Sequence, residues 1–190
     1  MNNTGVKGAR LRTIDITMIG LFCALGAVCA WISFPIAEIP ITMQTFSVFL
    51  TLAVLGGMRG TISIALYVAL GAVGVPVFSG MRGGIGVLLG VTGGYIIGFI
   101  FSSLVFWLIT ARLGNGIVVT ALASVIGLII CYAFGSLWFM AVYASGTGSI
   151  GLGAVLIKCV VPYLIPDAVK IALAVSVSGT LRKIMKNRAA

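Results

Sequence analysis

The sequence predicts an all-α integral membrane protein in which six transmembrane helices form one bundle, with both termini in the cytoplasm. The composition is the first reason: 61% of the 190 residues are hydrophobic and only 8% are charged, whereas a soluble domain has about 25% charged residues. The long apolar runs and the uneven placement of the basic residues are the second and third. We expect a single membrane domain over residues 1–190, with spans at about 14–34, 45–57, 61–74, 85–110, 117–143 and 166–182.

The first apolar run, residues 14–34, is long enough to cross a bilayer, which takes about 20 residues of helix. Within it Gly20 and Ala24 are small residues four apart, and so are Gly26 and Ala30. Small residues at this spacing let a second helix approach closely. The pattern indicates either a docking face for a partner or packing within the chain.

A polar connection containing Glu38 follows over residues 35–44, where prolines disfavour a helix. Two short apolar runs come next, at 45–57 and 61–74, joined by a tight glycine-rich turn at 56–60. Spans this short indicate helices that are buried against the others rather than surrounded by lipid.

Residues 75–94 contain seven glycines. Irregular backbone of this kind cannot face lipid, because its amides would be unsatisfied in hydrocarbon. We therefore expect it to be buried in protein or to line a wet cavity, where glycine lets the backbone approach a ligand. The spans at 85–110 and 117–143 follow, and the second carries the interface aromatics Trp138 and Tyr143.

The next apolar run, residues 154–161, is too short to cross a bilayer. We expect a short helix that lies at the membrane surface or caps the bundle. A break between Pro162 and Pro166 should follow, with the last helix running from Asp167 to about Leu181. Proline and a carboxylate are both favoured in the first turn of a helix.

Nine of the twelve basic residues fall at span ends that this topology places inside, in agreement with the positive-inside rule. There they also meet anionic lipid head groups. These nine are Lys7, Arg10, Arg12, Arg59, Arg112, Arg182, Lys183, Lys186 and Arg188. The other three are Arg82, Lys158 and Lys170. Together with Glu38 and Asp167 they indicate a polar site that opens outward, and we expect the Ser145–Ser149 turn outside as well.

Asp167 and Lys170 are the strongest candidates for that site. The whole chain has three acidic residues, and a charged side chain at a helix centre costs roughly 2.5–3.5 kcal/mol in a membrane. Three residues apart on a helix, the two side chains share one face. Either they hold a polar ligand between them, or they pair only with each other and hold the helix end.

Several kinds of chemistry are excluded. The chain has no histidine, and its cysteines, Cys23, Cys29, Cys131 and Cys159, stand singly in apolar runs as small core residues, so no metal site is expected. There is no Gly-Lys dipeptide and therefore no Walker A loop. Any ATP-driven work falls to another subunit. No nucleophile–base constellation indicates an enzyme, and basic residues at span ends do not indicate nucleic acid.

Several motifs together carry a family resemblance. They are Pro76-Val-Phe-Ser-Gly80, Gly83-Gly84-Ile-Gly86-Val-Leu-Leu-Gly90, Thr92-Gly-Gly-Tyr95 with Gly98-Phe99, Ile39-Pro-Ile-Thr-Met-Gln-Thr45, Leu55-Gly-Gly-Met-Arg-Gly60 and Ile165-Pro-Asp-Ala-Val-Lys170. Over nearly the whole chain the sequence resembles the BioY family, the biotin-binding S components of energy-coupling factor transporters. Val91 stands where that family usually has proline. The family's Ala-x-x-x-Ala docking motif is replaced here by the pairs Gly20/Ala24 and Gly26/Ala30.

The resemblance implies a six-helix protein of the prokaryotic plasma membrane that captures biotin on its outer side. Its partners would be a transmembrane coupling protein and a pair of ATPases, so that biotin is a ligand, this chain has no cofactor, and ATP is used by partner subunits. Biotin's carboxylate needs a cation, its ureido N–H groups an acceptor and its rings apolar walls. Lys170 or Arg82 would supply the first, Asp167 the second and aromatic residues, Trp138 included, the third. The expected ligand-binding residues are Asp167, Lys170, Arg82, Gly83, Gly84, Gly94, Tyr95, Thr42, Gln44, Tyr143 and Tyr163.

Each assignment has an alternative. Arg82 would otherwise bind lipid head groups or a loop carbonyl, Thr42 and Gln44 would cap the second helix, and the tyrosines would be interface anchors. The functional alternatives are an S component for another vitamin, a protein that carries biotin alone, and a non-transport structural or assembly subunit of a membrane complex. Ligand-binding assays and neighbouring transporter genes would separate the first two, and the third is favoured if the purified protein binds no small molecule. A titration with biotin is the most informative single experiment.

Overall fold

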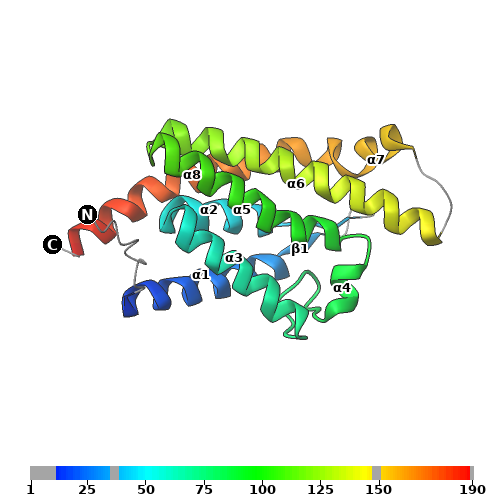
Figure 1. Ribbon diagram of the computed structural model, residues 1–190, viewed down its shortest axis with the longest axis horizontal. Coiled ribbons are helices and arrows are strands. Elements are labelled where there is room, and N and C mark those ends of the chain that lie inside the picture. Colours follow the sequence, from blue (N-terminus) through cyan, green and yellow to red (C-terminus); the bar gives the residue numbers. More distant parts are fainter. Residues whose placement is uncertain (1–11, 35–38, 147–150, 189–190) are drawn as a thin grey trace, which may run out of the picture.

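The computed structural model describes residues 12–34, 39–146 and 151–188, which form an elongated bundle of helices (Figure 1). Glu38 and most of the expected Ser145–Ser149 turn lie outside the described residues. The elements in chain order are α1 (Thr13–Trp31), β1 (Ser33–Phe34), β2 (Ile41–Thr42), α2 (Gln44–Leu55), α3 (Gly57–Ala72), α4 (Ile85–Leu89), α5 (Gly93–Leu113), α6 (Ile117–Gly146), α7 (Leu152–Cys159) and α8 (Val161–Arg188).

Within the described part of the chain, four helices are long and apolar enough to cross a membrane: Thr13–Trp31, Gly93–Leu113, Ile117–Ala144 and Val161–Ile184. The helices α2 and α3 are apolar but shorter, with 12 and 16 residues. The expected burial of the short helices is confirmed for α2, in which ten of the 12 residues are buried. In α3 one side remains exposed, with Leu66 and Ala65 on it. The protein is thus a mostly helical, multi-pass membrane protein.

The polar connection between α1 and α2 is not entirely irregular. Its strands β1 and β2 pair antiparallel, with Ser33 opposite Thr42 and Phe34 opposite Ile41. The N–H of Met43 also donates to the carbonyl of Ile32 at 3.1 Å. This short ribbon fixes the position of Thr42 at the start of α2.

The turn between α2 and α3 is shorter than the sequence predicts. The break occurs at Gly56 alone, which has a φ of 81°, and α3 already begins at Gly57. The prediction of a turn over 56–60 is wrong because the other glycines serve helix packing. A Cβ on Gly57 would lie 2.5 Å from Trp107 Cα, and one on Gly60 would lie 3.0 Å from Leu52 Cα.

The span predicted for residues 85–110 is interrupted, and its long helix begins only at Gly93. The short helix α4 ends at Leu89, and the N–H of Gly93 donates to the carbonyl of Gly90 at 3.0 Å. The chain turns so tightly here that a Cβ on Gly93 would lie 1.7 Å from the Leu88 carbonyl oxygen. Hydropathy does not reveal such a turn, because apart from Thr92 the residues from Leu88 to Gly94 are apolar or glycine.

The last helix begins at Val161 and not at Asp167, so the predicted break between the prolines is wrong. Pro162 lies in the first turn, where a helix needs no N–H donor. Pro166 removes the one donor that would bond to the carbonyl of Pro162. The two prolines thus cost a single helix bond, and Asp167 lies inside the helix rather than in its first turn. The short helix α7 ends at Cys159, two residues before the expected end at residue 161.

Small residues line the contact between α5 and α6. We call this contact the α5–α6 seam; its residues are Gly94, Gly98, Ser102, Gly127, Cys131 and Gly135. A Cβ on Gly98 would lie 3.1 Å from Cys131 Sγ, and one on Gly127 would lie 2.7 Å from Ser102 Oγ. The two backbones therefore approach closely, as small residues four apart allow in membrane helices.

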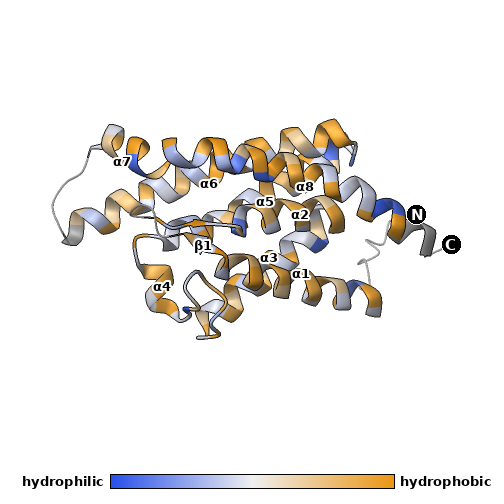
Figure 2. Ribbon diagram, turned by 180° about the vertical axis from the view of Figure 1, so that it is seen from behind, coloured by the Kyte–Doolittle hydropathy of each residue, from blue (hydrophilic) through white to orange (hydrophobic). Residues whose placement is uncertain are grey.

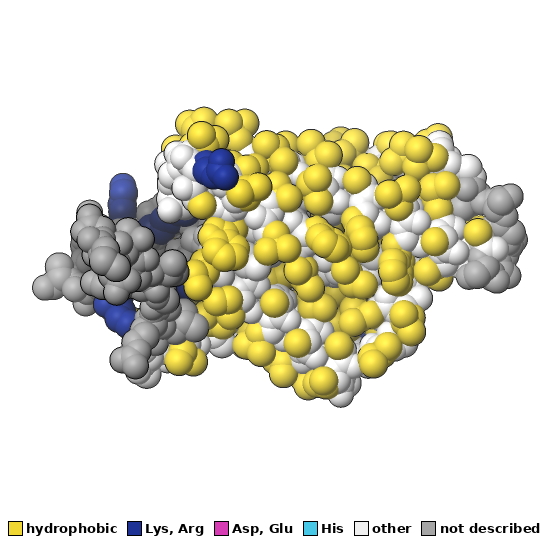
Figure 3. All heavy atoms as spheres, in the orientation of Figure 1, with side chains coloured by type: hydrophobic (Ala, Val, Ile, Leu, Met, Phe, Trp, Pro, Cys, Tyr) yellow, Lys and Arg dark blue, Asp and Glu magenta, His cyan; other side chains and the backbone are white. Residues whose placement is uncertain are grey.

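The two ends of the bundle differ in charge. The described basic residues at the end that carries both termini are Arg12, Arg59, Arg112, Arg182 and Lys183. There Asp15, which is buried in α1, lies 3.3 Å from the Arg59 guanidinium, and Arg182 donates to the carbonyl of Asn115 at 2.8 Å. On the face shown in Figure 3, dark blue side chains gather toward this end and yellow ones cover most of the rest. Seen from behind in Figure 2, the helices are orange over most of their length.

Candidate ligand-binding site

A cavity opens at the end of the bundle away from the termini. The empty space between its walls, solvent at its mouth included, is about 740 Å³. Most of its wall residues come from α2, α5, α6, α8 and the loop between α3 and α4, and β2, α4, α7, residues 39–40 and Thr92 contribute the others. The residues that line it are Ile39, Pro40, Thr42, Gln44, Thr45, Phe78, Ser79, Arg82, Val87, Thr92, Tyr95, Ile96, Phe99, Leu128, Cys131, Tyr132, Cys159, Tyr163, Asp167 and Lys170.

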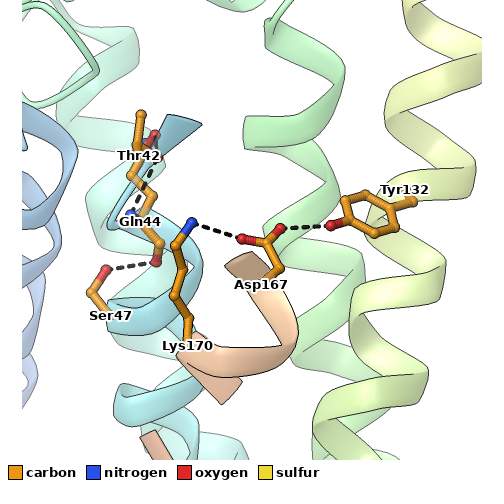
Figure 4. A network of polar contacts seen from close by, with 6 residues as sticks. All are labelled: Thr42, Gln44, Ser47, Tyr132, Asp167 and Lys170. Atoms are coloured by element: carbon orange, nitrogen blue, oxygen red, sulfur yellow. Dashed lines mark hydrogen bonds and ion pairs between the residues drawn. The ribbon is translucent and has the colours of Figure 1, made fainter. Parts of the chain in front are cut away.

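A buried polar network forms one wall. Lys170 Nζ lies 2.8 Å from Asp167 Oδ1, one helical turn away on α8. Tyr132 of α6 donates its hydroxyl to Asp167 Oδ2 at 2.6 Å. Asp167 and Lys170 are only 4% and 7% exposed. Figure 4 shows these contacts in a line, with Tyr132 at one end and Lys170 at the other, on the side of Gln44. The positive charge of Lys170 offsets the negative charge of Asp167. This wall is therefore polar but carries no net charge.

Another part of the cavity wall carries Thr42 of β2 and Gln44 at the start of α2. Thr42 donates its hydroxyl to Gln44 Oε1 at 2.9 Å, and the backbone N–H of Gln44 donates to Thr42 Oγ1 at 3.3 Å. The capping alternative is therefore partly right, since Thr42 does satisfy a backbone N–H at the start of α2. Both side chains nevertheless line the cavity.

Arg82 lies at the mouth, on the loop between α3 and α4. The loop folds back so that the N–H of Phe78 donates to the Arg82 carbonyl at 2.9 Å. The exposed Arg82 side chain donates through Nε to the Ser79 carbonyl at 3.2 Å. Its terminal guanidinium nitrogens have no hydrogen bond among the described residues, which leaves a positive charge beside the opening.

Seven of the eleven expected ligand-binding residues line the cavity, and four do not. Gly83 fits tightly against Val75, whose carbonyl oxygen would be 2.3 Å from an added Cβ, and Gly84 has a φ of 97°. Gly94 packs on Trp138 in the α5–α6 contact. Tyr143 stacks on Phe139 at a ring-centroid distance of 5.4 Å. The three glycines shape the backbone around the cavity and are not on its wall.

Trp138, which the resemblance offered as a wall for the biotin rings, does not line the cavity either. Its indole N–H donates to the Gly90 carbonyl at 3.1 Å and closes the turn before α5. By contrast, sequence reasoning missed Tyr132. The available signal was its depth: Tyr132 lies near the middle of the 30-residue helix α6, where a tyrosine cannot be an interface anchor and its hydroxyl needs a partner. Phe78, Ser79 and Thr92 are cavity residues as well, and they lie within the glycine-containing motifs of the family resemblance.

A comparison with protein families now decides the classification, because a profile of the BioY family matches residues 1–187. The chain belongs to the BioY family. A relative named as a probable biotin transporter BioY, from Pyrococcus horikoshii, is 38% identical over 90% of this chain and 98% of its own length. The biotin transporter BioY of Thermotoga maritima is 38% identical over 89% of this chain and 96% of its own length.

The fold of this BioY family member also matches a solved structure. A crystal structure described as the S-component for biotin from an ECF-type ABC transporter superposes with a TM-score of 0.80 at 26% identity, covering 90% of this chain and 91% of that one. The BioY family is one of transporter components and not of enzymes. With its apolar helices, this member is a multi-pass protein of the cell membrane.

Proposed function

We propose that this BioY family member is an S component that captures biotin in the cavity between α2, α5, α6 and α8. It delivers biotin for ATP-driven uptake by an energy-coupling factor transporter, together with a transmembrane coupling protein and ATPase subunits. The buried polar wall formed by Asp167, Lys170 and Tyr132 is the observation that carries this proposal. The named relatives and the similar solved structure support the choice of biotin as the ligand.

The neutral polar wall suits the ureido ring of biotin. That ring is uncharged, with two N–H donors and a carbonyl acceptor, so its binding leaves the charges of Asp167 and Lys170 paired. Asp167 accepts from the ureido N–H groups, and Lys170 donates to the ureido carbonyl. Tyr132, fixed at 2.6 Å on the other carboxylate oxygen, holds Asp167 in place for this contact. Apolar walls such as Phe99 and Leu128 accept the ring carbons.

The carboxylate of biotin is best placed at Arg82. Lys170 is already neutralised by Asp167 and is almost fully buried, whereas the guanidinium of Arg82 lies at the mouth beside the opening. An arginine also binds a carboxylate through two parallel hydrogen bonds. Of the two cations that the sequence offers for this role, we therefore favour Arg82, with the valeryl chain of biotin pointing outward.

Binding of ligands to purified, folded variants tests this arrangement. Asp167→Asn and Lys170→Gln should each weaken biotin, biotin amide and desthiobiotin alike, by about 10- to 150-fold, because a charge-assisted contact is lost. Arg82→Gln should weaken biotin more than biotin amide, since the amide has no carboxylate. A wild-type chain that fails to bind biotin, or that binds another vitamin in its place, contradicts the proposed function.

A charge swap provides the control for a purely structural pair. If Asp167 and Lys170 only hold α8 together, then Asp167→Lys combined with Lys170→Asp should keep most of the affinity for biotin. If they bind the ureido group, the swap should reduce affinity at least as much as either single change, because donor and acceptor then face the wrong partners. Retained affinity in both single variants removes the pair from the site.

The proposed topology has six spans, with both termini in the cytoplasm and the cavity outside. The basic residues at the end with the termini support it. In a cysteine-free background, a cysteine replacing Ser79 at the cavity should react with an impermeant thiol reagent added to intact cells, and one replacing Asn115 should not. Labelling of the Ser79 position only after permeabilisation contradicts this orientation.

A further inference from the structure

Behind the cavity wall, the side chain of Gln44 makes a second contact that points away from the ligand space. Its amide nitrogen Nε2 donates to the hydroxyl of Tyr67 on α3 at 2.7 Å. The same hydroxyl donates to the carbonyl of Val77, at a distance of 2.9 Å. Tyr67 is 4% exposed and does not line the cavity itself. It lines a smaller space between α1, α2 and α3, of which Gln44 is also a wall residue.

These contacts determine which way the Gln44 amide faces. A tyrosine hydroxyl has one proton, and here that proton is committed to the Val77 carbonyl. The tyrosine oxygen can then only accept, so the group of Gln44 that faces it must be the NH₂. At the other end of the amide, Thr42 donates to Oε1. One N–H and one lone pair of the amide remain for a ligand, in a fixed arrangement.

The loop that carries Arg82 accepts this hydroxyl at the Val77 carbonyl, but it has further anchors. Ser33 and Ser79 share a hydrogen bond of 2.8 Å, and the indole N–H of Trp31 donates to the Pro76 carbonyl at 2.9 Å. The ring of Phe78, which belongs to this loop, packs directly on Gly71 of α3, so that a Cβ added to Gly71 would lie 2.0 Å from Phe78 Cζ. Among the described residues, by contrast, Gln44 Nε2 has Tyr67 as its only hydrogen-bond partner. Loss of the hydroxyl should release the amide and leave the loop in place.

We propose that Tyr67 is a positioning residue for the ligand cavity, which orients the Gln44 amide so that its remaining N–H and lone pair face the ligand. This role rests on the proposed function, because the ligand in question is biotin. Tyr67 touches no ligand. It acts through Gln44 alone, so its removal has no effect on binding once Gln44 is absent.

Gln44 is the only glutamine in the sequence, which permits a test without any ligand. Protein labelled with ¹⁵N-glutamine and purified in detergent should give one pair of side-chain amide signals. In Tyr67→Phe this pair should shift, and its exchange with water should become about five- to tenfold faster, as expected for the loss of one hydrogen bond. Tyr67→Phe keeps the ring that packs on Phe78 at 5.6 Å, so we expect the fold to persist, as checked by thermal unfolding.

Ser63→Ala is the matched control. Ser63 is a buried residue of the same helix, one turn before Tyr67, and donates its hydroxyl to the Ile19 carbonyl at 2.9 Å. Its loss removes a comparable hydrogen bond without touching the cavity. The glutamine signals should be unchanged in this variant. If the signals of Tyr67→Phe coincide with those of the wild type, or if Tyr67→Phe fails to fold, the proposed positioning role is wrong.

Biotin binding supplies the second readout. Tyr67→Phe should weaken biotin about three- to tenfold, and Ser63→Ala should not. Added to Gln44→Ala, Tyr67→Phe should cause no further loss, whereas additive losses would show that Tyr67 acts by another route. If the wild-type chain binds no biotin, the proposed function fails separately, and the glutamine signals still decide whether Tyr67 orients Gln44.

Discussion

Two sets of small residues with the same spacing behave differently in this protein. In the α5–α6 seam the facing helix occupies the space beside each glycine. A Cβ added to Gly98 would lie 3.1 Å from Cys131 Sγ, and one added to Gly127 would lie 2.7 Å from Ser102 Oγ. On α1 the pair Gly20 and Ala24 is exposed, and nothing lies within 4 Å of a Cβ on Gly20. Another helix of the same chain thus packs against the small residues of the seam, but none of the described helices packs against Gly20.

The second small pair of α1 lies between these extremes. Gly26 faces the ring of Tyr67, 3.4 Å from an added Cβ, and Ala30 is fully buried. Each residue turns a helix by about 100°, so the six residues from Gly20 to Gly26 turn it by about 600°, which is equivalent to about 240°. The two pairs therefore lie on different faces of α1. Small residues at this spacing thus show that a helix can approach closely, and not which helix does so. The open pair, Gly20 and Ala24, is the one that we propose for docking a coupling protein.

The largest effect is expected where the seam is filled. Gly98→Leu should prevent or severely impair folding, because its side chain would meet backbone atoms of Cys131 at 3.2–3.3 Å already at Cβ, and overpacking costs about 1–3 kcal/mol or more. The measurements are the yield of monodisperse protein in detergent and its thermal unfolding. Gly20→Leu is the matched control and should behave as wild type in both. Equal stability of the two variants would remove the distinction between seam and open face.

The second effect concerns function rather than folding. Gly20→Leu, and likewise Ala24→Trp, should abolish ATP-dependent biotin uptake in cells that contain the coupling module, because a bulky side chain keeps a partner helix away. Biotin binding by the isolated chain should remain unchanged, since neither residue lines the cavity. Assembly with the coupling protein, measured by co-purification, should fall with uptake. Undiminished assembly in both variants would place the docking face elsewhere.

The same contrast explains how far the sequence predicts the fold. Apolar runs locate α1, α5, α6 and α8, because length and hydropathy are properties of a single segment. The boundaries that were wrong depend on contacts instead. The sequence predicts Gly57 in a turn, whereas it packs on Trp107 within α3. Gly93 begins a helix because the chain folds back on Leu88. A glycine in a turn and a glycine in a helix–helix contact look the same in the sequence. Only the position of the neighbouring helix distinguishes the two.

The cavity was predictable to a similar extent. Asp167 and Lys170 stand out because buried charges are rare in a membrane, and the structure brings both to the cavity wall. Tyr132 and Tyr67 do not stand out in an apolar sequence, and their roles follow from partners 35 and 23 residues away. Hydrogen bonds between residues so far apart in the sequence depend on how the helices pack. The spacing of residues along one helix does not predict that packing.

The smallest effect is expected at Gly26, where α1 meets Tyr67. Gly26→Ala should leave stability and biotin affinity almost unchanged, because its Cβ makes an ordinary contact of 3.4 Å with the ring and alanine favours a helix by up to about 1 kcal/mol over glycine. Gly26→Leu should instead displace the ring, and with it the hydroxyl that holds Gln44, and so weaken biotin by about the same three- to tenfold as Tyr67→Phe. Thermal unfolding and biotin titration of the two variants measure this. If Gly26→Ala is destabilised as strongly as Gly98→Leu, this position belongs with the filled seam. If Gly26→Leu binds biotin as the wild type does, a side chain at this position does not affect the cavity through the ring of Tyr67.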